Sequence, residues 1–111
     1  MSEPRKKDLI QGTLELLVLR VLSAGSLHGY GIAKRIEQIS DSALNIQKGS
    51  LYPALHRLEG KALIKAEWVL RDEKRPSKMY SLTQAGKKQL ERELEQWNVF
   101  TNAVNSVIKE A

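Results

Sequence analysis

The chain has 111 residues, of which 41% are hydrophobic and 28% charged, and this favours one soluble globular domain over a disordered or membrane-bundle protein. It contains no cysteine, which excludes disulfide frameworks, thiolate metal sites and cysteine nucleophiles. The formal net charge is +5, and residues 1–80 carry all of it, with 14 Lys/Arg against 9 Asp/Glu. Such a basic body suits a polyanionic partner such as nucleic acid, but the mild basicity of many small soluble proteins without such a partner explains it equally well.

Two helices are predicted in the first forty residues. Residues 8–24 place apolar side chains on more than one face, which indicates a helix buried on most sides. Residues 26–31 are too rich in glycine for a helix interior, and a second helix follows over about 30–39, with apolar positions at helical intervals. Residues 41–47 form a connector in which Leu44 and Ile46 alternate, so it could hold a short strand.

A third helix is predicted to begin within residues 47–50 and to end near residue 60, because its apolar residues are three and four positions apart. After it, residues 64–70 alternate and predict a strand, residues 71–77 form a charged turn, and a return strand ends at Leu82. Thr83 is a predicted N-cap for a last helix that runs to about residue 109 and is roughly 40 Å long.

These elements predict a mainly α fold with a small β-hairpin, namely a winged helix-turn-helix with a long C-terminal helix. Residues 1–82 would form the DNA-binding part and residues 83–111 the dimerisation helix, within one structural unit. The N-terminus has no apolar signal region, and we expect a cytoplasmic location.

The third helix carries the strongest candidate binding surface. The face opposite the leucine stripe has small residues at its start, is rich in hydrogen-bond donors and carries no carboxylate before Glu59. Such a face can enter a major groove and reach phosphates and base edges. A solvated amphipathic helix would look similar, but an exposed Tyr and Pro favour function. The residues of this face are Gly49, Ser50, Tyr52, Pro53, His56, Arg57 and Gly60.

Two further segments could contact DNA. The hairpin tip could straddle the phosphate backbone or place Arg75 in a minor groove, although Asp72 and Glu73 also suit a turn kept charged for solubility. The start of the second helix could hold a phosphate with Tyr30 as a donor, and a tight turn with Tyr30 packed on the core explains it equally well. The candidate phosphate contacts are Lys34, Lys48, Arg57, Arg75 and Lys78.

Catalysis and metal binding are not expected. His56 and Glu59 have the spacing of a two-ligand pair on a helix, but no third ligand lies nearby in the sequence. No nucleophile–base arrangement and no Gly-rich phosphate loop is present. We therefore expect neither an enzyme nor a bound cofactor.

The last helix carries a heptad seam, defined by Leu90, Leu94, Trp97, Thr101, Val104 and Ile108, with Phe100 and Val107 beside it. A domain this small cannot bury so long a helix, so the seam needs a partner chain, whereas folding back on its own domain could cover only its first turns. Trp97 is also a candidate ligand contact, because two indole rings near a two-fold axis could leave a flat slot for a planar aromatic molecule. The alternative is that Trp97 fills the dimer core.

Residues 48–59 (KGSLYPALHRLE) resemble the PadR family of bacterial transcriptional regulators, whose pattern there is approximately G-[TS]-L-Y-x-x-L-x-R-L-E. Residues 28–32 (HGYGI), residues 78–83 (KMYSLT) and Ala85–Gly86 support the resemblance, which covers essentially the whole chain. The length is similar to that of the small subclass with a single C-terminal helix. Two residues depart from the pattern: Ala62 stands where the family usually has Gly, and Met79 where Tyr is common.

The resemblance implies a homodimeric repressor on a pseudo-palindromic operator, with the third helix in the major groove and the wing on the backbone. It also implies that the last helices pair with each other and with the partner's first helix, which places Leu14 at the interface. In such families a small effector, often a phenolic acid or a planar drug, weakens DNA binding. The alternatives are a winged helix used only for protein interaction and a small-molecule-binding protein without DNA activity.

Overall fold

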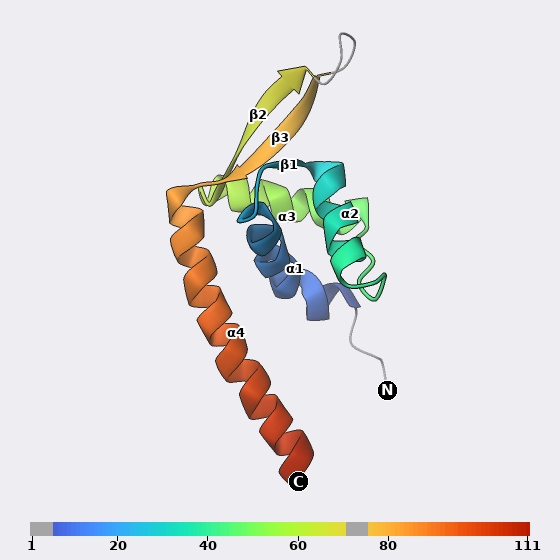
Figure 1. Cartoon of the computed structure of the whole chain (residues 1–111), viewed down its shortest axis with the longest axis vertical. Coiled ribbons are helices and arrows are strands. Elements are labelled where there is room, and N and C mark those ends of the chain that lie inside the picture. Colours follow the sequence, from blue (N-terminus) through green and yellow to red (C-terminus); the bar gives the residue numbers. More distant parts are fainter. Residues whose placement is uncertain (1–5, 71–75) are drawn as a thin grey trace.

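The computed structural model describes residues 6–70 and 76–111, with side chains from residue 12 onward. Its elements follow the predicted order, with one addition (Figure 1). They are α1 (Lys6–Leu22), β1 (Leu27–His28), α2 (Gly29–Ile39), α3 (Lys48–Gly60), β2 (Ile64–Leu70), β3 (Pro76–Leu82) and α4 (Gln84–Glu110). The winged helix-turn-helix with a long C-terminal helix is confirmed, and Figure 1 shows α4 protruding from the body.

The core lies between α1, α2, α3 and the inner half of the sheet. The helical spacing of apolar residues in α2 and α3 contributes to it, because each of these two helices turns one apolar stripe inwards. α1 is buried on several faces, as predicted, and it packs against α2, α3 and α4. The buried residues are Leu14, Leu16, Val18, Leu19, Leu22, Ile32, Ile36, Leu51, Ala54, Leu55, Leu58, Ile64, Tyr80 and Leu90.

The sheet has three antiparallel strands in the order β1-β3-β2. In the hairpin, Ile64 pairs with Leu82 at the base and Leu70 pairs with Pro76 at the outer end. β1 was missing from the sequence prediction, since two residues beside a glycine-rich turn show no alternation. Leu27 and His28 pair with Tyr80 and Met79, so β1 ties the start of α2 to the wing.

The connector between α2 and α3 contains no strand, so the short strand considered for residues 41–47 is wrong. Asp41 and Ser42 both adopt positive φ values, 53° and 64°, which turn the chain away from an extended path. Leu44 is exposed, and only Ile46 packs against the core. The alternation of Leu44 and Ile46 therefore reflects one anchoring residue rather than a strand.

The turn from α3 to β2 places Ala62 in the left-handed region, with φ of 59°. Ala62 stands where the family pattern usually has Gly, and the structure keeps the positive-φ turn at this residue. The conformation costs a non-Gly residue about 1 kcal/mol. The predicted N-cap at Thr83 is confirmed, because its Oγ1 accepts a hydrogen bond from the Gly86 N–H at 3.0 Å.

Candidate nucleic-acid interface

The exposed face of α3 is the centre of the candidate site. Because Leu51, Ala54, Leu55 and Leu58 point inwards, the opposite side of the helix is left in solvent. Tyr52 is 45% exposed, and Pro53, His56, Gly49 and Gly60 are exposed with it, while Ser50 is half-buried. The structure therefore brings the sequence-predicted face together, with the single exception of Arg57.

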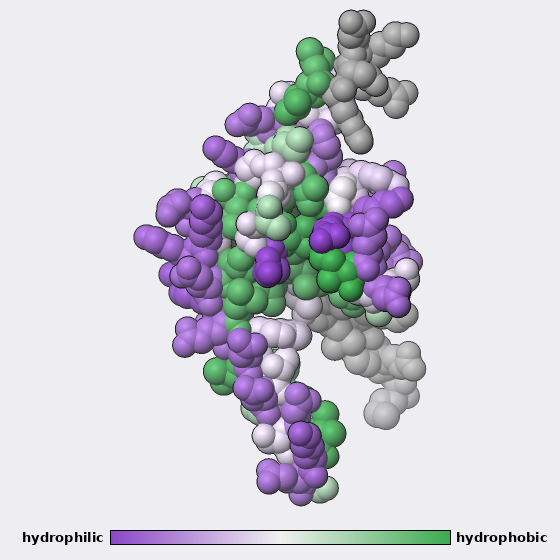
Figure 2. Space-filling model, viewed as in Figure 1, coloured by the Kyte–Doolittle hydropathy of each residue, from purple (hydrophilic) through white to green (hydrophobic). Residues whose placement is uncertain are grey.

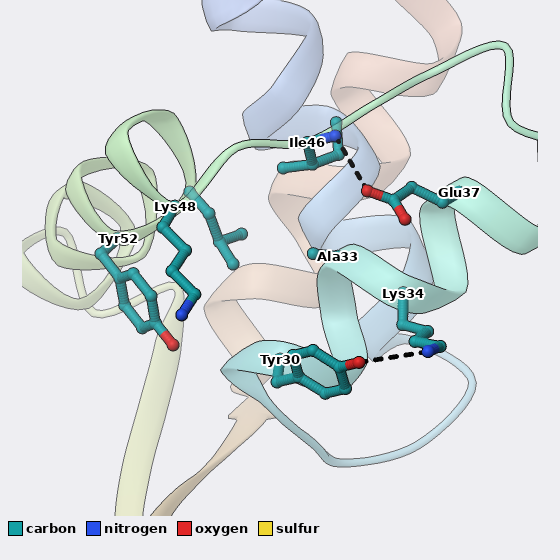
Figure 3. A pocket seen from close by; sticks show the side chains of 8 residues that line it. Tyr30, Ala33, Lys34, Glu37, Ile46, Lys48 and Tyr52 are labelled. Carbon is teal, nitrogen blue, oxygen red and sulfur yellow. Dashed lines mark hydrogen bonds between the residues drawn. The ribbon is translucent and has the colours of Figure 1, made fainter.

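A cavity of about 150 Å³ opens where the first turns of α2 and α3 meet (Figure 3). Ala33, Ile46 and Leu51 contribute apolar lining, and Glu37 lies at one side. In Figure 3, Lys48 and Tyr52 of α3 face Tyr30 and Lys34 of α2. Two lysines and two tyrosines thus line one hollow, with the Tyr30 hydroxyl turned to Lys34 and away from Lys48 and Tyr52. The two ammonium groups outnumber the one carboxylate of the lining, Glu37, which suits an anion such as a phosphate.

Lys34 and Tyr30 form a pair within this cavity. The Lys34 Nζ donates a hydrogen bond to the Tyr30 hydroxyl at 3.1 Å and lies 5.3 Å from the centre of its ring. The bond to Tyr30 raises the pKa of Lys34 above its usual value. Tyr30 is 61% exposed, which favours the surface interpretation over a packed core tyrosine.

The two helix starts that border the cavity are open to an anion. Neither His28, at the N-cap of α2, nor Gln47, at the N-cap of α3, makes a side-chain capping bond, and neither first turn contains an acidic residue. The first N–H groups of both helices therefore lack a side-chain acceptor, and their dipoles favour negative charge. Glu37, which the sequence did not single out, fixes the approach to α3, because its Oε1 accepts the Ile46 N–H at 3.3 Å.

Arg57 lies on the side of α3 that faces α1. Its Nε is 3.5 Å from Oε2 of Glu15, and the Lys61 Nζ is 3.8 Å from the other oxygen of the same carboxylate. The sequence placed Arg57 on the exposed face, and it gave no sign of Glu15 as a partner, because the two residues are far apart along the chain. Glu93 of α4 lies near this group: burial, with the charge of Glu15, raises the pKa of Glu93, and Lys61 acts in the opposite direction.

The wing, which is the hairpin of β2 and β3, carries another candidate cation, Lys78. The Lys78 Nζ lies 5.6 Å from the ring centre of Trp68, its cross-strand neighbour, and Trp68 is 68% exposed. The His28 Nδ1 lies 2.9 Å from Oγ of Ser77 and 3.1 Å from the carbonyl oxygen of Lys78, which holds the wing against the start of α2. Arg75, the other predicted wing contact, falls outside the described residues.

The heptad seam divides into a buried part and an exposed part. Leu90 and Leu94 pack against the chain's own core. Beyond them, Trp97 is 39% exposed, Val104 38% and Ile108 71%, and Figure 2 shows separate hydrophobic groups among mainly hydrophilic ones on the protruding part of α4. Thr101 is half-buried, and its hydroxyl donates to the carbonyl oxygen of Trp97 at 2.9 Å, so it is satisfied within the helix.

Leu14 does not lie where the resemblance implied. It is only 2% exposed, inside the core of its own chain, and so offers almost no surface to a partner. The reason is that α1 crosses the centre of the domain and turns Leu14 towards the other helices.

Neither a metal cluster nor a membrane span is found in the part of the chain that the structure describes. Among the side chains described, those of residues 12–70 and 76–111, no three His, Asp or Glu are grouped to hold a metal ion. None of the described helices has both the length and the apolar character needed to cross a bilayer.

Residues 18–92 match the PadR-like family of transcriptional regulators. The transcriptional regulator YqjI of Escherichia coli (strain K12) is 33% identical over 92 residues. These cover 83% of this chain but 42% of YqjI, so the chain spans less than half the length of that curated relative.

Two solved structures have the same architecture. A transcriptional regulator from Clostridium thermocellum superimposes with a TM-score of 0.83 at 29% identity, covering 89% of this chain and 96% of that one. Bacillus subtilis PadR in complex with operator DNA superimposes with a TM-score of 0.68 at 28% identity, covering 74% of this chain and 46% of that one. Because the first superposition covers 89% of this chain, the likeness extends beyond the winged helix into α4.

Proposed function

The chain belongs to the PadR-like family of transcriptional regulators, and on this premise we propose that it is a homodimeric repressor that binds a pseudo-palindromic operator in the cytoplasm. In this proposal residues 1–82 read the DNA and residues 83–111 pair the two copies. The Bacillus subtilis relative was solved with operator DNA, which supports the same class of partner here.

The observation that carries the proposal is that Tyr30, Lys34, Lys48 and Tyr52 line one cavity beside the exposed face of α3. A DNA phosphate in this cavity would anchor the start of α3 at the groove edge, and Ser50 and His56 would then face the bases. Lys78 and Arg75 would add backbone contacts from the wing. The assignment of Arg75 follows from the sequence and the others from geometry and charge, and each can be tested by substitution.

The exposed part of the heptad seam supports the homodimer. Trp97, Phe100, Val104, Val107 and Ile108 leave a long apolar stripe in solvent on a single chain, and a second α4 is the simplest cover for it. Two copies related by a two-fold axis would present their α3 helices to half-sites one DNA turn apart, roughly 34–36 Å.

An effector would act on α4, the helix that pairs the two copies. The Trp97 and Phe100 ring centres are 6.2 Å apart and the rings are tilted by 43°, so aromatic surface is concentrated near the middle of the stripe. We propose that a planar aromatic or phenolic molecule stacks there between the two copies and weakens DNA binding.

A gel shift tests the DNA contact. The full chain is mixed with DNA from upstream of its own gene, since repressors often control their own synthesis, and with a scrambled duplex of equal length. We expect a shifted band that the scrambled duplex competes poorly, and a weaker band for Lys48→Ala. The matched control is Lys109→Ala, at the far end of α4, which should bind as the wild type does.

No shift with any duplex, for a folded dimer, would contradict the proposal and favour a protein-interaction or small-molecule-binding module. A reporter fused to the bound promoter should rise when the gene is deleted, and a fall would indicate an activator.

A further inference from the structure

The first turn of α4 is fixed to the turn that ends α3. The Thr83 hydroxyl donates to the carbonyl oxygen of Ala62 at 2.7 Å, lies 3.0 Å from that of Leu63, and accepts the Gly86 N–H. The backbone N–H of Thr83 also donates to the Leu63 carbonyl, at 3.1 Å. We call Ala62, Leu63, Thr83 and Gly86 the α3–α4 junction.

Gly86 makes the closest approach in this junction. It is buried, and a Cβ atom built on it would lie 2.1 Å from the carbonyl oxygen of Leu63 and 2.7 Å from a side-chain methyl carbon of Leu82. The obstacle at Leu63 is backbone, which cannot rotate away as a flexible side chain can. Only a glycine therefore lets α4 start directly on the α3–β2 turn.

The same turn is bonded back to the recognition helix, α3. The Ala62 N–H donates to the carbonyl oxygen of Glu59 at 2.9 Å, and the Leu63 N–H donates to that of Leu58 at 3.0 Å. Hydrogen bonds thus run without a break from the last turn of α3, through Ala62 and Leu63, to the first turn of α4. A chain of short backbone contacts of this kind leaves little freedom in the angle between the two helices.

We infer that Thr83 and Gly86 are positioning residues that set the angle between α4 and α3, and through it the separation of the two recognition helices and the half-site spacing that the dimer accepts. The inference rests on the proposed function, because it needs α4 to pair two copies. Trp97 lies about 16 Å beyond Gly86 along the helix, so a tilt of roughly 10° at the junction moves it by about 3 Å. Such a displacement at the pairing helix changes the position of both recognition helices relative to each other.

The absence of cysteine gives a direct test in solution without DNA. Gly60→Cys places one spin label at the exposed end of α3, where a Cβ meets no atom within 4 Å, and pulsed EPR measures the label-to-label distance across the dimer. We expect a single narrow distribution for this protein and, after Gly86→Ala, one shifted by several ångström or clearly broadened. Gly12→Ala is the matched control, because its Cβ would meet no atom within 4 Å. Circular dichroism verifies that each variant is folded.

Thr83 variants keep the test decisive if Gly86→Ala fails to fold. Thr83→Val keeps the shape of the side chain and removes the hydroxyl, so the distribution should broaden, and Thr83→Ser should restore it. Folded dimers of Gly86→Ala, or of Thr83→Val, with the parent distribution would overturn the inference.

Binding to DNA supplies the second measurement and separates this inference from the proposed function. Duplexes selected from a random pool by the wild-type protein are remade with base pairs added or removed between the half-sites. Gly86→Ala should bind one half-site as the wild type does, but should lose at least about tenfold in affinity at the wild-type spacing, because both half-sites can no longer be engaged together. If the wild type selects no duplex, the proposed function fails and this inference falls with it. If Gly86→Ala retains the wild-type optimum, only this inference fails.

Discussion

The ring of Tyr52 lies against Gly29: a Cβ atom at residue 29 would be 3.1 Å from Cε1 and 3.2 Å from the hydroxyl oxygen of the tyrosine. Gly29 is the first residue of α2, and Tyr52 is on the exposed face of α3. The glycine therefore lets the aromatic ring rest on the start of the neighbouring helix, where it borders the cavity. This contact fixes the position of the Tyr52 hydroxyl without a hydrogen bond.

Gly29→Ala should change DNA binding more than it changes stability. The added methyl must displace the ring by a few tenths of an ångström or more, and the ring can move because Tyr52 is 45% exposed. We expect the free energy of unfolding to change by less than about 1 kcal/mol, since alanine also favours the helix. Affinity for the operator should fall several-fold, with altered sequence preference. Gly31→Ala is the control, because its Cβ would make ordinary contacts of 3.6 Å and 3.8 Å with Leu27. Equal operator binding by Gly29→Ala and the wild type would show that the ring position is irrelevant.

Glu15→Gln should destabilise the fold modestly. It removes the negative charge that faces Arg57 and Lys61, and the side chains of Glu15 and Arg57 are only 16% and 34% exposed. Because the pair is partly open to water, we expect a loss of about 1 kcal/mol in the free energy of unfolding, measured by urea denaturation. Glu67→Gln, an exposed carboxylate on β2, should leave the unfolding midpoint unchanged. A midpoint for Glu15→Gln equal to that of the wild type would indicate that the ion pair contributes nothing.

The salt dependence of operator binding reports whether Arg57 leaves Glu15. If Lys34, Lys48, Arg75 and Lys78 each neutralise one phosphate per subunit, the slope of log affinity against log salt should be about −7 for the dimer, and it approaches −9 if Arg57 also joins. We expect the smaller slope for the wild type and the steeper one for Glu15→Gln, which frees the guanidinium. Filter binding at four or five salt concentrations measures both. A wild-type slope near zero would show that these side chains make no electrostatic contact with DNA phosphates.

Much of this architecture could be read from local patterns. The spacing of Leu51, Ala54, Leu55 and Leu58 placed α3 and its buried stripe, and Thr83 marked the start of α4, because helix periods and N-caps depend on neighbouring residues. The face of α3 opposite the stripe was predictable for the same reason.

Most of the features that the sequence did not reveal depend on residues far apart in the chain. Arg57 turns from the exposed face because Glu15 of α1 meets it, and Leu14 is buried because other helices surround it. β1 exists only because β3 lies beside it. The contact between Gly86 and Leu63 is likewise invisible to periodicity, although the Ala85–Gly86 pair was noted as part of the family pattern.

A truncation placed by the structure should yield a folded monomer. Ending the chain after Lys88 would remove the whole seam, including Leu90, which is 6% exposed and belongs to the core. Loss of the dimer could then not be told apart from unfolding of the domain. Ending it after Gln96 keeps Leu90 and Leu94 and removes the exposed part of the seam. Light scattering should give the mass of one chain, and operator affinity should fall by orders of magnitude, because two half-sites are no longer bound in one event. A dimer that survives this cut would place the interface elsewhere.

Trp97 offers the most direct test of an effector site. A planar aromatic ligand that stacks between two copies of Trp97 should quench indole fluorescence, whereas a tryptophan that only fills the interface should not respond to ligand. Trp68 is the one other tryptophan and is 68% exposed on the wing. The emission of Trp97→Phe therefore comes from Trp68 alone and can be subtracted from the emission of the wild type. We expect planar drugs or phenolic acids to quench the fluorescence of the wild type in a saturable way and to weaken its gel shift at the same concentrations.

The Trp97→Phe dimer should show neither effect and should still bind the operator, because the ring of Phe keeps the stripe apolar. Trp68→Phe is the reciprocal control, in which quenching persists. If a broad panel of such molecules leaves the wild type unchanged while Trp97→Phe weakens the dimer, Trp97 is a packing residue and the effector proposal is wrong.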